Sequence, residues 1–207
     1  LGDVYKRQAQ AQVLPWAAQP LHSAQATAHA LDLSTLWPQA PVTALSGTVR
    51  AAPANGTWKA QVDLRNARSG PWDQQRLPLD TLQANVVRQD TQWQLDGLQA
   101  TLGRAQLGGE GRYQPAQGSL AAQWQGQLQA RALDPSRLWS TLAPAALDLT
   151  ASARQTAQQP DRITLQATAK GTGDAPSAAG LRLRELRLQG HWRGEGRVLQ
   201  IDEGLLD

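Results

Sequence analysis

Apolar and polar side chains alternate along much of the chain, which is the pattern of β-strands that have one buried face and one wet face. Residues 57–65 place an apolar side chain at every second position, namely Trp58, Ala60, Val62 and Leu64. The same alternation occurs in residues 81–87, 92–97, 119–130, 162–170, 180–192 and 196–201. A helix would scatter these apolar side chains around its circumference. The pattern therefore predicts an antiparallel meander of about ten strands.

Short polar segments separate the predicted strands and have the composition of hairpin turns. Asn55-Gly56 suits a tight turn, whereas residues 89–91 and 115–118 suit longer ones. Within residues 181–192 the apolar phase slips by one position near Glu185, which predicts a β-bulge. Residues 107–111 read LGGEG without the Lys-Ser/Thr ending of a phosphate-binding loop, so we expect a closely packed strand there.

One phrase of the sequence is written nearly twice. Residues 30–37 read ALDLSTLW and residues 132–139 read ALDPSRLW, which match at six of eight positions and lie 102 residues apart. In each copy an Asp precedes a short helical pattern, so Asp32 and Asp134 are predicted N-caps, with Pro135 at the first helical position. Such a copy favours a repeat architecture over a single closed domain.

The repeat divides the chain into two predicted units, residues 21–129 and a truncated second unit at residues 130–207. We set aside residues 1–20 as a non-native or disordered leader, because the opening octapeptide LGDVYKRQ differs in character from the rest. The chain has no Met, begins with Leu1 and stops just after the strand-like stretch GRVLQID. We therefore expect it to be an internal fragment of a longer protein.

Composition points away from catalysis. The absence of Cys excludes disulfides and thiolate chemistry, and the three His residues have no metal-ligand spacing. We predict no catalytic residue, no cofactor and no metal site. The formal net charge of +3 is small, and the arginines near residue 185 alternate with Leu on a predicted strand, so we expect no nucleic-acid partner. No stretch approaches the roughly 18 consecutive apolar residues of a membrane helix.

Two arrangements of the strands fit this pattern equally well. The apolar face can line an open groove, or two apolar faces can pack together in a β-sandwich. Trp58, Trp93 and Trp124 lie on the apolar phase of their strands, which favours a buried or groove-facing position over a sugar-stacking one. A carbohydrate-binding or adhesin-like β-sandwich module remains the alternative, and it requires at least two Trp on the wet face of one sheet.

A further set of residues carries a resemblance to a known family. After the ALDxSxLW phrase and a strand meander, the chain has a segment of the form Asn-x-x-x-Gly-Pro-Trp-Asp followed by Leu-Pro-Leu. The residues concerned are Asn66, Gly70, Pro71, Trp72, Asp73, Leu77, Pro78 and Leu79. With residues 101–113, this segment resembles the TamB family, the translocation and assembly module subunits of the AsmA-like superfamily. The resemblance covers about residues 21–207.

The resemblance implies an all-β fold, in which a long antiparallel sheet curls into an open, taco-like groove with short helices between repeat units. It also implies a parent protein that is anchored in the inner membrane of a Gram-negative cell and extends through the periplasm. The implied role is outer-membrane biogenesis, namely protein assembly and secretion with an outer-membrane barrel partner that binds regions outside this chain. A proposed second role is the transport of phospholipids along the groove.

Phospholipid acyl chains would lie on the inner apolar face. The alternation predicts which side chains line that groove: Trp58, Ala60, Val62, Leu64, Trp93, Leu95, Leu120, Trp124, Leu128, Ile163, Leu165, Leu181, Leu183, Leu186 and Leu188.

Overall fold

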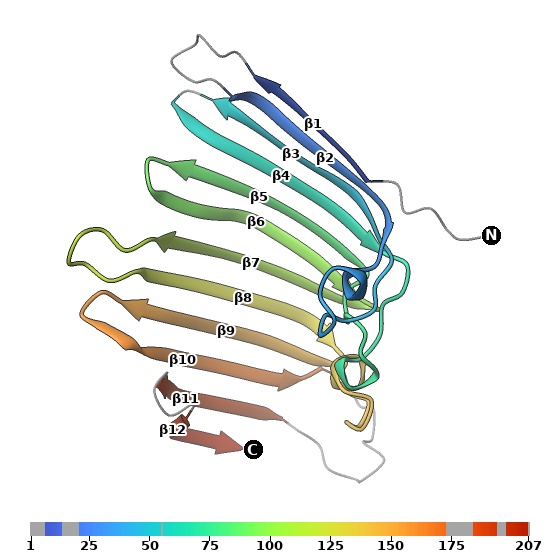
Figure 1. Ribbon diagram of the computed structural model, residues 1–207. Coiled ribbons are helices and arrows are strands. Elements are labelled where there is room, and N and C mark those ends of the chain that lie inside the picture. The colour runs from blue at the N-terminus through green and yellow to red at the C-terminus, as the bar shows by residue number, and fades with distance from the viewer. Residues whose placement is uncertain (1–6, 14–20, 55, 173–183, 194–197, 207) are drawn as a thin grey trace.

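Twelve β-strands form a single antiparallel sheet in which every strand pairs with its neighbour in the sequence (Figure 1). The computed structural model describes residues 7–13, 21–54, 56–172, 184–193 and 198–206. The strands are β1 (Arg7–Val13), β2 (Leu21–Leu31), β3 (Leu45–Ala54), β4 (Thr57–Asn66), β5 (Thr81–Gln89), β6 (Gln92–Leu102), β7 (Ala105–Gln114), β8 (Gln123–Leu133), β9 (Leu147–Thr156), β10 (Gln159–Gly171), β11 (Glu185–Arg193) and β12 (Val198–Leu206).

The prediction of an all-β protein with an open, curled sheet and little helix is confirmed. The sheet is not closed, because β1 and β12 are its two edges. Within the described part of the chain all strands belong to this one sheet, so they do not form the two packed sheets of a sandwich. Residues 7–13, which sequence analysis set aside with the leader, form β1; their apolar phase is mostly Ala, which contrasts weakly with the intervening Gln.

Most of the short and most of the long connections lie at opposite ends of the strands, although β6 and β7 are joined by only two residues at the loop end. Short hairpins join β3 to β4, β5 to β6 and β9 to β10 at one end, on the left of Figure 1. Longer loops gather at the other end, and they hold the short helices η1 (Leu33–Thr35), η2 (Trp72–Gln74) and α1 (Pro135–Leu138). The turn predicted at 89–91 is tighter than expected, because Gln89 pairs with Gln92 and only Asp90, at φ 54°, and Thr91 form it. Asn55 lies outside the described residues.

The two copies of the repeated phrase fold in the same way. Asp32 accepts hydrogen bonds from Ser34 N at 3.0 Å and from Thr43 N at 3.1 Å. Asp134 accepts the corresponding bond from Ser136 N at 3.0 Å. Both Asp residues are N-caps, as predicted, and Pro135 occupies the first turn of α1. Each cap ties a helix to the loop that returns to the sheet.

The repeat also sets the local backbone conformation. Ala30 and Ala132 have positive φ values of 46° and 52°, which L residues adopt rarely. Both stand where the strand pairing shifts register, between Ala28 and Leu31 in the first copy and between Ala130 and Leu133 in the second. Such bulges bend the strand and increase its twist, so they help to curl the sheet.

The most buried apolar cluster lies at the loop end of the central strands. It consists of Leu102, Ala105, Ala130 and Leu133, and Leu79 and Leu138 from the loops pack against it. These two loop residues therefore close one end of the apolar face, while the rest of that face extends towards the hairpin end.

Candidate functional site

One face of the sheet is apolar from β2 to β12, because the strand register aligns the apolar phases of neighbouring strands. Leu98 on β6 pairs with Gly109, which pairs with Leu128 on β8. The same row continues through Ala151, Ala167, Leu188 and Gly204 on the last four strands. Similar rows run parallel to it, so the apolar side chains form a continuous surface, here called the apolar face.

Most of the side chains predicted to line a groove lie on this apolar face. They are Trp58, Ala60, Val62 and Leu64 on β4, Trp93 and Leu95 on β6, Trp124 and Leu128 on β8, Ile163 and Leu165 on β10, and Leu186 and Leu188 on β11. Leu120 differs, because β8 begins only at Gln123 and Leu120 lies in the preceding loop with its side chain exposed. Leu181 and Leu183 lie outside the described residues.

The predicted bulge near Glu185 also falls largely outside the described residues, since the structure describes β11 only from Glu185 onward. A bulge does occur between the last two strands. There Gly190 pairs with Ile201 while Gln189 pairs with Glu203, so Asp202 is the extra residue of β12. The bulge keeps Ile201 on the same face of the sheet as Gly204.

The apolar face is hollowed between β6 and β12. Leu95, Leu98, Leu128, Leu165, Leu188 and Ile201 surround a hollow of about 430 Å³. Its floor is made of small residues, namely Gly126, Ala151, Ala153, Ala167 and Gly190. Large side chains at these five positions would fill the space, so the sequence of small residues creates the hollow.

Little of the apolar face is fully buried. Among the described residues only eight apolar side chains are buried, and most of these lie near the loop end. Leu95, Leu128, Leu165 and Leu188 are only half-buried, although they occupy the centres of their strands. A packed core would enclose such leucines, so this face is exposed to whatever surrounds the protein.

Residues 66–79, on which the family resemblance rests, shape the loop that closes one end of the apolar face. Asn66 is buried, and its Oδ1 accepts hydrogen bonds from Ala44 N at 3.0 Å and from Arg68 N at 3.1 Å. Gly70 packs against the aliphatic part of Arg76, which would have to shift to admit a Cβ at this position. Leu77 bridges to Ser69, Pro78 is buried and Leu79 joins the apolar cluster. The segment therefore has a clear structural role.

Pro71, Trp72 and Asp73 form the outer part of the same loop. Pro71 is the N-cap residue of η2, and the Trp72 side chain is exposed. Both Asp73 oxygens accept hydrogen bonds from Ser140, one from its backbone N–H at 3.0 Å and one from its hydroxyl. These two bonds lower the pKa of Asp73. They also link the η2 loop to the segment after α1, although the two residues are far apart in the sequence.

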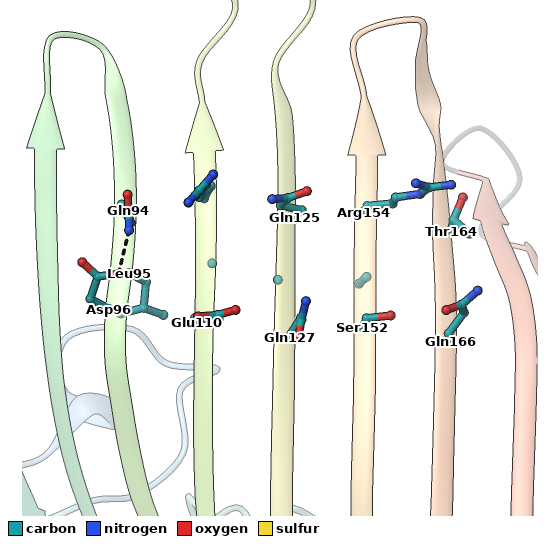
Figure 2. Close-up of a pocket in the computed structure, with 14 residues that line it drawn as sticks. Gln94, Leu95, Asp96, Glu110, Gln125, Gln127, Ser152, Arg154, Thr164 and Gln166 are labelled. Carbon is teal, nitrogen blue, oxygen red and sulfur yellow. Dashed lines mark hydrogen bonds between the residues drawn. The ribbon is translucent and has the colours of Figure 1, made fainter.

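The opposite face of the sheet is polar and has a hollow of its own, of about 410 Å³ (Figure 2). Two rows of polar side chains cross it from β6 to β10. One row contains Gln94, Arg112, Gln125, Arg154 and Thr164, and the other contains Asp96, Glu110, Gln127, Ser152 and Gln166. Sequence analysis did not single out this polar hollow, because its residues are simply the wet phase of the same strands.

The pKa shifts of two further carboxyl groups and one guanidinium follow from their local contacts. Burial would raise the pKa of Asp32, but hydrogen bonds from Thr43 and Ser34, with Arg68 nearby, lower it overall. The hydrogen bond between Arg187 and Glu185 lowers the pKa of the carboxyl and raises that of the guanidinium.

One imidazole on the polar face is buried. His191 Nδ1 lies 3.0 Å from Asp202 Oδ2 and 3.2 Å from an Arg162 nitrogen. Among the described residues no three His, Cys, Asp or Glu side chains are placed to hold a metal ion together. Within the same part of the chain, no helix has the length and apolar character needed to cross a membrane.

The Trp positions bear on the sugar-binding alternative. Trp58, Trp93, Trp124 and Trp192 lie on the apolar face, and Trp37, Trp72 and Trp139 lie in the loops. Of the Trp residues that the structure describes, none lies on the polar face. Comparison with known proteins identified no matching family model, no matching curated protein and no matching solved structure.

Proposed function

We propose that this chain is a non-enzymatic segment of an apolar conduit whose open face holds the acyl chains of phospholipids. The observation that carries the proposal is the apolar face itself, which crosses the sheet without a second layer over it in the described part of the chain. A soluble protein rarely leaves such a surface uncovered unless it binds a partner or a ligand. The hollow of about 430 Å³ between β6 and β12 offers space for a flexible hydrocarbon chain.

The chemistry of this face suits a hydrocarbon better than a polar ligand. The side chains around the hollow are Leu, Ile and Ala, and the alternation directs the neighbouring Gln, Thr and Ser to the opposite face. Removing a methylene group from water yields about 0.8 kcal/mol, so contact with several methylenes suffices for binding without any fixed polar group. Neighbouring rows of the apolar face have similar side chains, so a bound acyl chain has no single preferred position on it. This similarity favours movement of the acyl chain along the face.

The wider role rests on the resemblance to the TamB family. The parent protein would bridge the periplasm from the inner membrane and contribute to outer-membrane biogenesis, with its barrel partner bound through other regions. Support from this chain is limited to its architecture, an open curled sheet with short helices between strands and with apolar residues on one face. Phospholipid transport is the part of that role to which the apolar face relates directly.

Lipid capture tests the proposal. The chain is purified from bacterial cells without detergent and extracted with organic solvent, and the extract is assayed for phospholipid by mass spectrometry. We expect bound phospholipid, and we expect the double variant Leu165→Asp, Leu188→Asp to lose it because two charges would stand in the hollow. The matched control is Gln166→Asp, Gln189→Asp, which places the same charges on the polar face. Equal lipid content in both variants would contradict the proposal.

A further inference from the structure

The loops at one end of the strands expose an unusual set of large apolar side chains. Trp37 is 62% exposed, Trp72 is 44% exposed and Trp139 is 48% exposed. Leu36 and Leu142 stand beside them with exposures of 38% and 48%. Trp37 and Trp139 are equivalent residues of the repeated phrase, so the repeat places an exposed indole at the same position in each copy.

These side chains belong to one continuous structure, here called the loop rim, which comprises residues 32–44, 67–80, 103–104 and 134–146. Val42 N donates to Gln75 O at 2.8 Å, which joins the first loop to the second. Ser140 binds Asp73, which joins the second loop to the third. Figure 1 shows the loops stacked at the same end of the sheet, on the right of the view.

The charged side chains of the loop rim differ in their exposure. Its four carboxylates, Asp32, Asp73, Asp80 and Asp134, all accept hydrogen bonds from backbone or hydroxyl donors within the rim. Its four arginines, Arg68, Arg76, Arg104 and Arg137, are all exposed. Within the described residues none of these arginines forms a salt bridge. Asp73 is exposed as well, but Asp32 is buried and Asp80 and Asp134 are half-buried. Arginines therefore outnumber carboxylates among the exposed charges of the rim.

Exposed indoles, leucines and unpaired guanidinium groups together match the chemistry of a lipid headgroup layer. Trp is enriched at membrane interfaces because its ring is apolar and its N–H is polar. Leucines at the same level reach the boundary of the acyl chains, and guanidinium groups bind phosphate oxygens. The three indoles line neither of the two hollows described above, so they are poorly placed to enclose a small ligand.

We propose that the loop rim is a docking surface for the headgroup layer of a bilayer that contains anionic phospholipid. The surface is separate from the apolar face and does not depend on lipid capture there. It nevertheless borders that face, because Leu79 and Leu138 extend from the rim onto the apolar cluster. A bilayer docked at the rim would thus lie along one side of the conduit.

Flotation of the whole chain with vesicles tests this docking. The vesicles contain either phosphatidylcholine alone or equimolar phosphatidylcholine and phosphatidylglycerol. We expect binding to the second kind, weakened by added salt because charge contributes to it. The double variant Trp37→Ser, Trp139→Ser should bind about tenfold more weakly or worse. Circular dichroism of each variant establishes that the sheet is intact.

Matched variants separate the loop rim from other surfaces. Leu142→Ser should weaken vesicle binding, whereas Leu205→Ser, at an equally exposed leucine of the edge strand β12, should not. Arg104→Gln, Arg137→Gln should reduce the preference for phosphatidylglycerol, whereas Arg112→Gln, Arg154→Gln, with the same charge change on the polar face, should leave it intact.

Some results would overturn the docking proposal. One is wild-type chain that fails to float with either kind of vesicle, which would leave an acidic protein as the better partner for the loop rim. Equal losses in the rim variants and their matched controls would overturn it as well. The aspartate variant of the apolar face distinguishes the two proposals: it should lose captured lipid and still float with vesicles. If vesicle binding disappears in the variant Leu165→Asp, Leu188→Asp but persists in the rim variants, the docking proposal is wrong. The proposal of lipid capture on the apolar face would not be affected by that result.

Discussion

Replacing Asp32 by Ala should destabilise the protein more than the equivalent change at Asp134. Asp32 is only 8% exposed, and its carboxylate binds Ser34 N, Ser34 Oγ and Thr43 N. Loss of an N-cap costs about 0.5–2 kcal/mol. Thr43 is 1% exposed, so its N–H would also lose its partner out of reach of water, which adds about 1–3 kcal/mol. We therefore expect Asp32→Ala to cost about 1.5–5 kcal/mol.

The repeat supplies the internal comparison. Asp134 makes the same cap to Ser136, but its third bond, from Ala145 N, is longer at 3.3 Å, and the surroundings are only half-buried. Water can therefore replace the lost acceptor, and Asp134→Ala should cost no more than about 2 kcal/mol.

Equilibrium urea unfolding, followed by far-UV circular dichroism, measures both values. Asp32→Asn serves as the control, because an amide oxygen of the same reach keeps one acceptor for the Thr43 N–H. We expect it to cost less than Asp32→Ala. The reasoning would be refuted if Asp134→Ala cost as much as Asp32→Ala, since the difference in burial would then have no effect.

Three further predictions concern pH, backbone packing and the hollow. The pKa of Asp32 is lowered in the folded state, so its ionised form stabilises the protein above the unfolded pKa of about 3.9. This stabilisation is lost as the pH falls through the folded pKa. The difference in free energy of unfolding between wild type and Asp32→Asn, measured by urea titration, should therefore shrink on acidification. A Cβ on Gly47 would lie 2.0 Å from a backbone oxygen of β4, whereas Gly118 faces open space. Thermal unfolding should therefore show that Gly47→Ala lowers the free energy of unfolding by more than about 2 kcal/mol. Gly118→Ala should lower it by only about 1 kcal/mol. Ala167→Phe should fill the hollow and reduce captured lipid, while Thr168→Phe on the opposite face should not; equal lipid content in the two would count against the assigned location.

The features that could be predicted from the sequence are local ones. Alternation of apolar and polar residues indicated β4, β5, β6, β8 and β10 to β12, since side chains of opposite character report directly on the two faces. Asp134 followed by Pro135 indicated the start of α1, because capping depends on residues a few positions apart. The strand β1 was not predicted, because its apolar phase consists mostly of Ala.

Other features depend on which segments meet in space. Leu120 continues the alternation of β8, yet the strand begins after it, since the preceding residues turn instead of pairing. The bond between Asp73 and Ser140 joins loops 67 residues apart, so no local pattern indicates it. The polar hollow arises because particular strands become neighbours, and its residues carry no signal beyond being polar.

The most direct test of the central claim uses the absence of Cys from the chain. A single Cys is introduced in turn at positions 165, 166, 167 and 168 of β10 and labelled with an environment-sensitive fluorophore. Phospholipid with brominated acyl chains is then added, and quenching is measured at each position. We predict strong quenching at 165 and 167, which lie on the apolar face, and weak quenching at 166 and 168. Uniform quenching, or stronger quenching at 166 and 168, would contradict the account.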